Sequence, residues 1–373
     1  MYSLSSETID EVINHKLITT DAKKLVTSLQ TTDPSRQALV PFTKGGKEMF
    51  SSRSKETRAT RSILAFVKKV LCISKSEVQS SSNLLSSLVK QKCGTIQKAY
   101  GVIVEERISG SGGSVKVTCR NSDGRMFAVK THREARKDEP LHKYMQWLNN
   151  EITVATLLSN PFIIQTHEVI KEDGKIHSVM EYCPHDLYQL VESNQVDEKM
   201  AARYFVQIVH AISHMHSLGI AHRDIKLENI CITEKNSVKL IDFGCAFVFR
   251  SPASIEKRIR LATTTCGSEA YIAPELHSRS PYDPRKSDIW SIAVVYLAMI
   301  LRSFPWSMAK SFDYGYKMFL KHRDNPRYFN RIPKSAVPII QRMLDPNPVT
   351  RASISDILND SWVKSIRLDV NSL

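Results

Sequence analysis

Short apolar runs separated by turn residues fill the chain from residue 98 to residue 182. Runs of this length that are rich in Val, Ile and Phe and bounded by Gly, Asn or Asp are typical of β-strands. Residues 121–124 and 173–174 each join two such runs and have the composition of hairpin turns. The pattern therefore predicts an antiparallel sheet that includes residues 102–104, 115–119, 126–130, 167–170 and 176–180.

From residue 183 onward the apolar positions follow helical spacing instead. Residues 198–219 carry apolar side chains three and four positions apart and end at Gly219, which is typical of an amphipathic helix. The apolar run 289–301 is shorter than the roughly 18–20 residues that a transmembrane helix needs, so it predicts a buried core helix. A further helix is predicted over 149–158, between the two groups of strands. We expect no segment to cross a membrane.

A polar cluster lies within this helical part. Residues 221–229 are Ala-His-Arg-Asp-Ile-Lys-Leu-Glu-Asn, and Asp242-Phe243-Gly244 follows thirteen residues after Asn229. A hairpin between the strand-like runs 230–232 and 238–241 brings Asn229 close to Asp242. Asp224 then faces an amide and a second carboxylate. This set can accept a hydroxyl proton at Asp224 and hold Mg²⁺ through the oxygens of Asn229 and Asp242.

His-Arg-Asp, an Asn five residues later and then Asp-Phe-Gly resemble the sequence signature of protein kinases. Polar loops with Asp and Asn are common, but both motifs in this order and at this separation leave little room for chance. The resemblance covers about residues 98–366. It implies the bilobal α+β protein-kinase fold, with a small β-rich lobe (98–182) that holds one main helix and a larger helical lobe (183–366). It also implies ATP and Mg²⁺ as cofactors.

The resemblance implies catalytic roles for four residues. Asp224 would orient and deprotonate the attacking hydroxyl, and Lys226 would lie over the γ-phosphate as a point charge. Lys130 would neutralise the α- and β-phosphates. Glu151, ten residues before Pro161, would hold Lys130 by an ion pair. Taken alone, each Lys or Glu is more often a solvated surface charge, so these roles rest on the resemblance.

The resemblance also implies a nucleotide site whose glycine-rich loop is incomplete. Gly113 and Gly110 match the third and second glycines, but the first falls on Ile108, or one residue is deleted, which predicts looser positioning of ATP. Asp186 is expected either to bind the ribose or only to cap a helix. The expected nucleotide contacts are Ile108, Gly110, Gly112, Gly113, Val115, Ala128, Lys130, Met180, Glu181, Cys183, Asp186, Asn229 and Asp242, and the expected metal ligands are Asn229 and Asp242.

Residues 244–273 resemble a kinase activation segment. Its candidate phosphorylation sites are Ser251, Ser254, Thr263, Thr264 and Thr265. Arg223 either binds a phosphate there and orders the segment, or is merely packed. Cys245 and Cys266 flank the segment, and a redox role is open to them, although most such thiols are inert.

Several further positions carry the resemblance. Lys226 and Ser268 point to specificity for Ser and Thr, and Arg351 matches the arginine that pairs with Glu275. Asp288 would accept hydrogen bonds from the backbone of the catalytic loop. Within kinases, residues 183–187, 266–268, 282–284 and 304–306 resemble the fungal halotolerance and nitrogen-permease-reactivator group. That group controls nutrient and cation transporters at the plasma membrane.

The net charge of the chain and its basic N-terminal residues indicate possible partners. The net charge of +14 predicts attraction to acidic partners, such as phosphorylated proteins, anionic membranes or nucleic acid, or else a soluble enzyme with a charged surface. Residues 1–95 form a basic, Ser-rich extension that we expect to be flexible and regulatory. Within it, residues 62–71 could form a basic amphipathic helix that lies on an anionic membrane, covers a groove of the kinase domain or packs on its own domain. Residues 367–373 are expected to be a tail.

The cysteines of the chain indicate its cellular compartment. The seven cysteines, at positions 72, 93, 119, 183, 231, 245 and 266, include no C-x-x-C pair, which predicts free thiols in a reducing compartment. We therefore expect a cytoplasmic, monomeric protein that can associate with membranes through residues 51–95. We expect no nucleic acid partner, because no surface pattern of interleaved aromatic and basic residues is evident.

The sequence alone leaves three questions open. The incomplete glycine loop allows a pseudokinase scaffold, although retention of Asp224, Asn229 and Asp242 argues against it. The charge allows a basic nucleic-acid or membrane-binding module, whose binding would depend on salt. The substrate sequence is ambiguous, because Glu228 favours basic residues before the acceptor, whereas the basic activation segment favours acidic ones.

Overall fold

The computed structural model of the chain describes residues 89–91, 96–107, 112–250, 259–278 and 280–368. The chain divides into two units after Leu88, and the described residues all belong to the second, Val89–Leu373. Predictions at the following positions lie outside the described residues: the helix at 62–71, most of the membrane-binding segment 51–95, Ile108, Gly110, Ser251 and Ser254.

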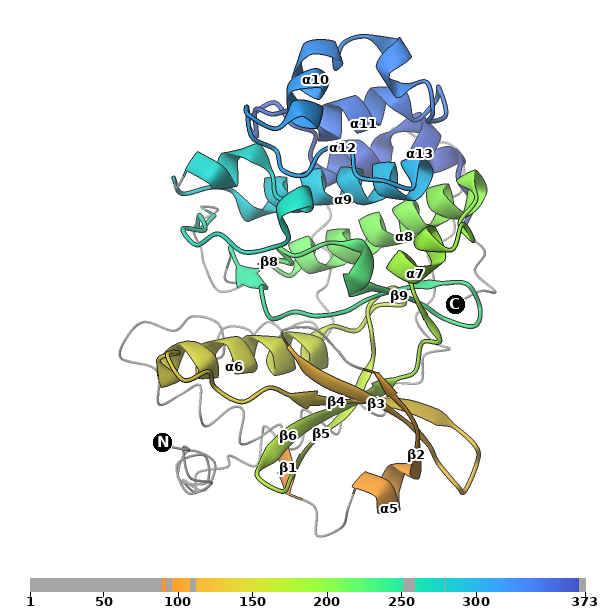
Figure 1. Cartoon of the computed structure of the whole chain (residues 1–373), viewed down its shortest axis with the longest axis vertical. Coiled ribbons are helices and arrows are strands. Elements are labelled where there is room, and N and C mark those ends of the chain that lie inside the picture. The colour runs from red at the N-terminus through yellow and green to blue at the C-terminus, as the bar shows by residue number, and fades with distance from the viewer. Residues whose placement is uncertain (1–88, 92–95, 108–111, 251–258, 279, 369–373) are drawn as a thin grey trace, which may run out of the picture. The chain divides into compact units, whose positions relative to one another are not determined.

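A six-stranded sheet forms the first lobe (Figure 1). Its strand order is β1-β5-β6-β4-β3-β2, with antiparallel neighbours except for β1 and β5, which run parallel. The strands are β1 (Val89–Gln91), β2 (Val102–Arg107), β3 (Gly113–Cys119), β4 (Met126–His132), β5 (Thr166–Glu172) and β6 (Lys175–Glu181). Each predicted run lies within one of β2 to β6, which confirms the predicted antiparallel sheet.

The main helix of this lobe, α6 (Leu141–Leu157), begins earlier than the predicted residue 149. Pro140 precedes it and provides no side-chain hydrogen bond to the first turn, so the sequence carries no capping signal there. Tyr144 and Leu148 are buried and anchor this first half of the helix. Packing, not local sequence, therefore decides where α6 starts.

Two elements precede the predicted start of the domain at residue 98. β1 pairs in parallel with β5, so that Val89 lies opposite Val169. Helix α5 (Ile96–Tyr100) packs Ile96 and Tyr100 into a core cluster with side chains of β4, β5 and β6. The sheet therefore extends to residues before 98, and the other domain limits stay predictions.

Two long helices, α8 (Glu198–Ser217) and α9 (Pro284–Leu301), lie side by side in the second lobe (Figure 1). Asp197 caps α8 by accepting a hydrogen bond from the Met200 N–H, and the apolar face of the helix is buried as predicted. Helix α9 is buried along almost its whole length, as the run 289–301 predicts. The other α-helices among the described residues of this lobe are α7 (Leu187–Glu192), α10 (Tyr314–His322), α11 (Val337–Met343), α12 (Ile354–Asn359) and α13 (Ser361–Ser365).

These helices complete the predicted bilobal α+β architecture. Within the ranges that the structure describes, no helix combines the length and the apolar character that crossing a membrane requires.

Short strands hold the polar cluster in this lobe. β9 (Ile230–Ile232) and β10 (Val238–Leu240) form the predicted hairpin, and β7 (His185–Asp186) pairs with β9. The Ile241 N–H donates to the Asn229 carbonyl oxygen at 3.0 Å, so Asn229 and Asp242 are brought close, as expected. β8 (Ile220–Ala221) pairs with β11 (Phe247–Val248), which fixes the segments before and after the cluster.

A buried ion pair joins two distant parts of this lobe, as predicted. Arg351 binds both carboxylate oxygens of Glu275, at 2.6 and 2.8 Å, and its side chain is 0% exposed. It also donates to the carbonyl oxygens of Asp345 and Lys286, at 2.9 and 2.7 Å. Breaking one partner of such a pair leaves an uncompensated buried charge.

Replacing Arg351 with Met should therefore lower the free energy of unfolding by about 3–5 kcal/mol in urea denaturation. The matched control is Arg342→Met, because Arg342 pairs with Asp356 at 3.1 Å on the exposed surface. Exposed pairs contribute about 0–1 kcal/mol. Equal losses in the two variants would contradict the buried-pair interpretation.

Candidate functional site

The loop that carries the His-Arg-Asp motif is held by one buried carboxylate at the start of α9. Asp288 is 0% exposed and accepts hydrogen bonds from the backbone N–H groups of His222 and Arg223, at 2.9 and 2.8 Å. His216 Nε2 lies 2.8 Å from the same carboxylate. This is the structural role expected of Asp288. Arg223 has a φ of 68°, in the sparsely populated left-handed region, and these bonds hold it there.

Asp224 lies at the centre of a network of donors. Its Oδ2 accepts from Lys226 Nζ at 3.0 Å and from Asn229 Nδ2 at 3.1 Å. Its Oδ1 lies 3.4 Å from the hydroxyl oxygen of Ser268, which also accepts from Lys226 Nζ at 3.0 Å. The structure thus brings together Asp224, Lys226 and Asn229 from the catalytic loop with Ser268 from the loop of residues 266–268, which we name the substrate loop.

Asp242 follows β10 in a strained backbone conformation, with a φ of 63°. The next residue, Phe243, is buried against His222, with ring centroids 5.5 Å apart. Burial raises the pKa of Asp242, but the charge of Lys130 and the Gly244 N–H outweigh it and hold that pKa below its ordinary value. Asp242 is therefore a carboxylate near neutral pH.

Lys130 on β4 contacts Glu151 on α6, with Nζ 2.6 Å from Oε1. Both side chains are buried. Burial lowers the pKa of Lys130, but Glu151 and Asp242 more than offset this, so that pKa is raised. Burial and Asp242 raise the pKa of Glu151, and Lys130 opposes this shift without reversing it. Lys130 therefore interacts with the acidic side chains of both Glu151 and Asp242.

The end of the glycine-rich loop approaches this group. A Cβ atom placed on Gly112 would lie 3.4 Å from Lys130 Nζ and 3.9 Å from Asp242 Oδ2. Gly113 has a φ of 136°, and a Cβ there would lie 2.0 Å from the Thr131 carbonyl oxygen, so only glycine fits. The structure therefore places Gly112 and Gly113 beside Lys130 and Asp242.

Further side chains lie on the same face of the sheet as Lys130. Val115 lies opposite Lys130, and Ala128 lies opposite Met180, so the alternation of strands puts these side chains on the same face. Met180 is followed by Glu181, whose Oε1 accepts from the Gln165 N–H at 2.7 Å and from Lys239 Nζ at 2.9 Å.

The connection between the lobes includes Cys183, which is buried, and Asp186. The Asp186 carboxylate caps α7 by accepting from the Gln189 N–H at 2.8 Å. This is one of its two expected roles, and ribose binding stays a prediction.

Sequence reasoning missed two residues that shape this site. Arg107, at the end of β2, donates to the carbonyl oxygens of Cys183 and Pro184, at 3.4 and 3.1 Å, and so ties the sheet to the connection between the lobes. Trp147 on α6 lies against Gly244, where a Cβ atom would come within 2.3 Å of the indole nitrogen. These contacts join positions far apart in the chain, so no local pattern could have revealed them.

The residues present fit a magnesium–nucleotide complex. Asp242 offers a carboxylate. Asn229 uses Nδ2 for its bonds to Asp224, at 2.9 and 3.1 Å, so its amide oxygen is the atom it can offer a cation. Mg²⁺ is typically held by one or two side-chain oxygens together with substrate phosphates and water. The Lys130 ammonium, close to Gly112 and Asp242, is the cation that a phosphate would meet here.

Arg223 also contacts the activation segment. Its guanidinium donates to the Thr264 carbonyl oxygen, to Thr264 Oγ1 at 3.1 Å and to the Tyr282 hydroxyl at 3.0 Å. Of the candidate phosphorylation sites that are described, Thr264 is the one that these hydrogen bonds place at Arg223. Both interpretations of Arg223, packing and phosphate binding, are compatible with this position.

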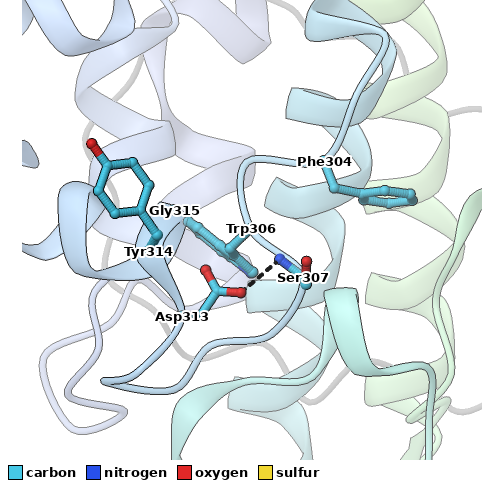
Figure 2. A pocket seen from close by; sticks show the side chains of 6 residues that line it. All are labelled: Phe304, Trp306, Ser307, Asp313, Tyr314 and Gly315. Carbon is cyan, nitrogen blue, oxygen red and sulfur yellow. Dashed lines mark hydrogen bonds between the residues drawn. The ribbon is translucent and has the colours of Figure 1, made fainter.

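A separate hollow of about 450 Å³ lies on the helical lobe and contains no predicted site residue (Figure 2). It is lined by Phe304, Trp306, Ser307, Asp313, Tyr314 and Gly315. The Asp313 carboxylate accepts from the N–H groups of Ser307 and Tyr316, at 3.1 and 2.9 Å, so it caps α10. None of the residues that line this hollow belongs to the cluster around Asp224.

Comparison with known proteins decides the family. A model of the protein kinase domain matches residues 104–363. The chain belongs to the protein kinase family. The kinase is similar to the Nitrogen permease reactivator protein of Saccharomyces cerevisiae, with 36% identity over 302 residues, which cover 69% of this chain and 38% of that protein.

Two further fungal relatives are named serine/threonine-protein kinases. PRR2 of Saccharomyces cerevisiae is 34% identical over 289 residues, covering 69% of this chain and 41% of that protein. The protein hal4 of Schizosaccharomyces pombe is 34% identical over 262 residues, covering 68% and 41%. The predicted family and its fungal group are thus confirmed, and the kinase spans about two fifths of the length of these relatives.

Proposed function

We propose that this kinase transfers the γ-phosphoryl group of ATP to Ser and Thr hydroxyls of protein substrates. The observation that carries the proposal is the arrangement of opposite charges in one site. Lys130, held by Glu151 at 2.6 Å, interacts with Asp242, while Asp224 hydrogen-bonds to Asn229 and Lys226. Phosphoryl transfer needs mainly positioning and electrostatic stabilisation, which such fixed groups supply.

Each group has a distinct role in this reaction. Lys130 neutralises phosphate charge, and because Glu151 fixes it, no reorganisation is needed when the charge moves. Asp242 and Asn229 would hold Mg²⁺, which neutralises charge on the β- and γ-phosphates when it is bound. Asp224 accepts the proton of the attacking hydroxyl. Lys226, with Nζ 3.0 Å from Asp224 Oδ2, supplies positive charge near the transferred group.

The position of Ser268 supports Ser and Thr as acceptors. Its hydroxyl oxygen lies 3.0 Å from Lys226 Nζ and 3.4 Å from Asp224 Oδ1, so the substrate loop reaches the catalytic carboxylate directly. A substrate backbone that binds along this loop lies close to Asp224. A short side chain then places its hydroxyl within reach of the carboxylate, whereas the longer tyrosine side chain would extend past it.

We also propose that this kinase regulates membrane transporters. The name of one relative, Nitrogen permease reactivator protein, supports this. The proposal includes action in the cytoplasm as a monomer, with binding to anionic membrane surfaces through residues 51–95 and no nucleic acid partner. The net charge of +14 supports the membrane contact.

The central proposal is tested by incubating the purified 373-residue protein with radiolabelled Mg-ATP and a generic basic protein substrate. We expect label on phosphoserine and phosphothreonine, dependent on the metal. The matched control is Asp224→Asn purified in parallel, which removes the signal of any contaminating kinase. Absence of transfer by the unchanged protein while ATP still binds would contradict the proposal and favour a pseudokinase.

A positional-scanning peptide library then distinguishes the two interpretations of substrate sequence. Glu228 is exposed at the edge of the site, and its carboxylate accepts from the Tyr271 hydroxyl at 3.4 Å. Selection of basic residues before the acceptor, lost in Glu228→Gln, would assign this role to Glu228. Selection of acidic residues would assign the recognition to the basic activation segment.

A further inference from the structure

Arg107, at the end of strand β2, lies on the face of the sheet that carries Lys130. It is directly opposite Val115 on β3, and Val115 is directly opposite Lys130 on β4. Residues that face each other across antiparallel strands have their side chains on the same side of the sheet. Arg107, Val115 and Lys130 therefore form one row across the face that the proposed function assigns to ATP, with a cation at each end.

One carboxylate orients the Arg107 guanidinium. Arg107 Nε lies 2.7 Å from Glu105 Oε1, and Nη2 lies 3.1 Å from Glu105 Oε2, so the contact is bidentate. The two side chains are 34% and 46% exposed. The bidentate contact fixes the plane of the guanidinium, while Glu105 and solvent offset its charge. Arg107 therefore acts through the directions of its donors more than through its charge.

The other hydrogen bonds of this guanidinium reach the connection between the lobes. Nη2 donates to the Pro184 carbonyl oxygen at 3.1 Å and to the Tyr182 hydroxyl at 3.2 Å, and Nη1 donates to the Cys183 carbonyl oxygen at 3.4 Å. The guanidinium carbon lies 5.5 Å from the centre of the Tyr182 ring, within the range of a cation–π contact. One side chain of β2 thus holds three successive residues of the connection.

The phosphates and the nucleoside of ATP need different surroundings on this face. Lys130 and Asp242 lie close to each other, and the proposed function assigns the phosphates to them. Ala128 and Met180 are apolar, lie opposite each other and share the face of Lys130. Met180 is one residue from the end of β6, directly before the connection. The flat, largely apolar base is therefore suited to the part of the face that borders the connection.

We propose that Arg107 is a positioning residue for the nucleoside part of ATP. By holding the backbone of residues 182–184 against β2, it orders the side of the site that receives the base before ATP binds. Binding then requires less ordering of the protein, which increases the affinity. The inference rests on the proposed ATP site, but it does not require phosphoryl transfer.

Replacing Arg107 with Met should weaken the binding of adenosine and of Mg-ATP to the 373-residue protein by the same factor, about tenfold. The KM for ATP should rise by this factor while kcat changes less than about twofold, because the groups of the chemical step keep their own contacts. Arg107→Lys should not restore affinity, since one ammonium cannot reproduce the planar fork of donors. Glu105→Gln should give a smaller loss in the same direction. Calorimetric titration with each ligand measures these affinities.

Two further variants are the controls. Arg120→Met removes an arginine that is 31% exposed, pairs with Asp123 at 2.9 Å and lies 4.9 Å from the centre of the Phe127 ring. These contacts lie at the turn between β3 and β4, so both affinities should stay unchanged in this variant. Lys130→Met should weaken the binding of ATP but not that of adenosine.

The pattern across the two ligands decides the inference. Unchanged adenosine affinity in Arg107→Met would overturn it, because a loss confined to ATP would mean that Arg107 acts on the phosphates through its charge. Tighter binding of both ligands would also overturn it, since Arg107 would then obstruct the site. Equal losses in Arg107→Met and Arg120→Met would assign the effect to the fold of the lobe. If the expected losses occur in a protein that transfers no phosphate, the proposed function is wrong and this inference stands.

Discussion

Replacing Asp224 with Asn should lower phosphotransfer to protein substrates by about 10²–10⁴-fold, with ATP affinity unchanged. A carboxylate can accept the proton of the attacking hydroxyl, whereas an amide nitrogen can only donate. The substitution preserves the shape of the side chain, and the amide oxygen can still accept from Lys226 or Asn229, which now contact Oδ2 at 3.0 and 3.1 Å. The loop should therefore keep its fold while losing its base.

Three measurements separate this result from a general loss of structure. Single-turnover rates report the chemical step, calorimetric titration reports ATP binding, and urea denaturation reports the free energy of unfolding. The matched control is Asp324→Asn, since the Asp324 side chain is 94% exposed and the variant should behave like the unchanged protein. If ATP affinity in Asp224→Asn fell as steeply as the rate, Asp224 would be a nucleotide-binding group and not the base.

The parts of the fold that the sequence predicts are those set by local pattern. Strands β2 to β6 are short apolar runs bounded by turn residues, α8 has apolar residues at helical spacing and α9 contains a continuous apolar run, and each of these elements was found. The first half of α6 lacks a capping signal at Pro140 and is fixed by burial of Tyr144 and Leu148. Strand β1 has three residues and depends on a parallel partner distant in the chain, Val169 for Val89. No local pattern encodes such long-range packing.

The candidate site also has features that the sequence predicts and features that depend on long-range packing. The motifs around Asp224 and Asp242 lie within one short stretch of chain, and the hairpin between them is a local structure, so their proximity is predictable. Glu151 could be expected beside Lys130 only through the family resemblance, because the two lie on different elements. Neither the hydrogen bonds of Arg107 to the connection between the lobes nor the contact of Trp147 with Gly244 follows from spacing. Both depend on how separate segments fold against one another.

Replacing Lys130 with Met should lower kcat/KM for ATP by about 10²–10³-fold, the loss expected when one preorganised charge at the reacting centre is removed. Lys130 Nζ lies 2.6 Å from Glu151 Oε1 and also interacts with Asp242, so its loss leaves two carboxylates without their shared cation. Burial raises the pKa of Glu151, and Lys130 opposes this. Without Lys130, the pKa of Glu151 should be raised further, and the phosphates lose a positioned charge.

Lys116→Met is the matched control for this substitution, because it removes the same side chain from the neighbouring strand β3. Lys116 pairs with Glu106 at 2.9 Å, and both side chains are exposed, so its loss should change kcat/KM and stability little. Glu151→Gln provides a second comparison, since it keeps the Lys130 charge but weakens the bond that positions it. We expect its kcat/KM for ATP to lie between those of Lys130→Met and the unchanged protein. Steady-state kinetics with ATP as the varied substrate measure this order. If Lys130→Met matched Lys116→Met in kcat/KM, the buried pair would only support the fold, and phosphate binding would have to be assigned to other groups.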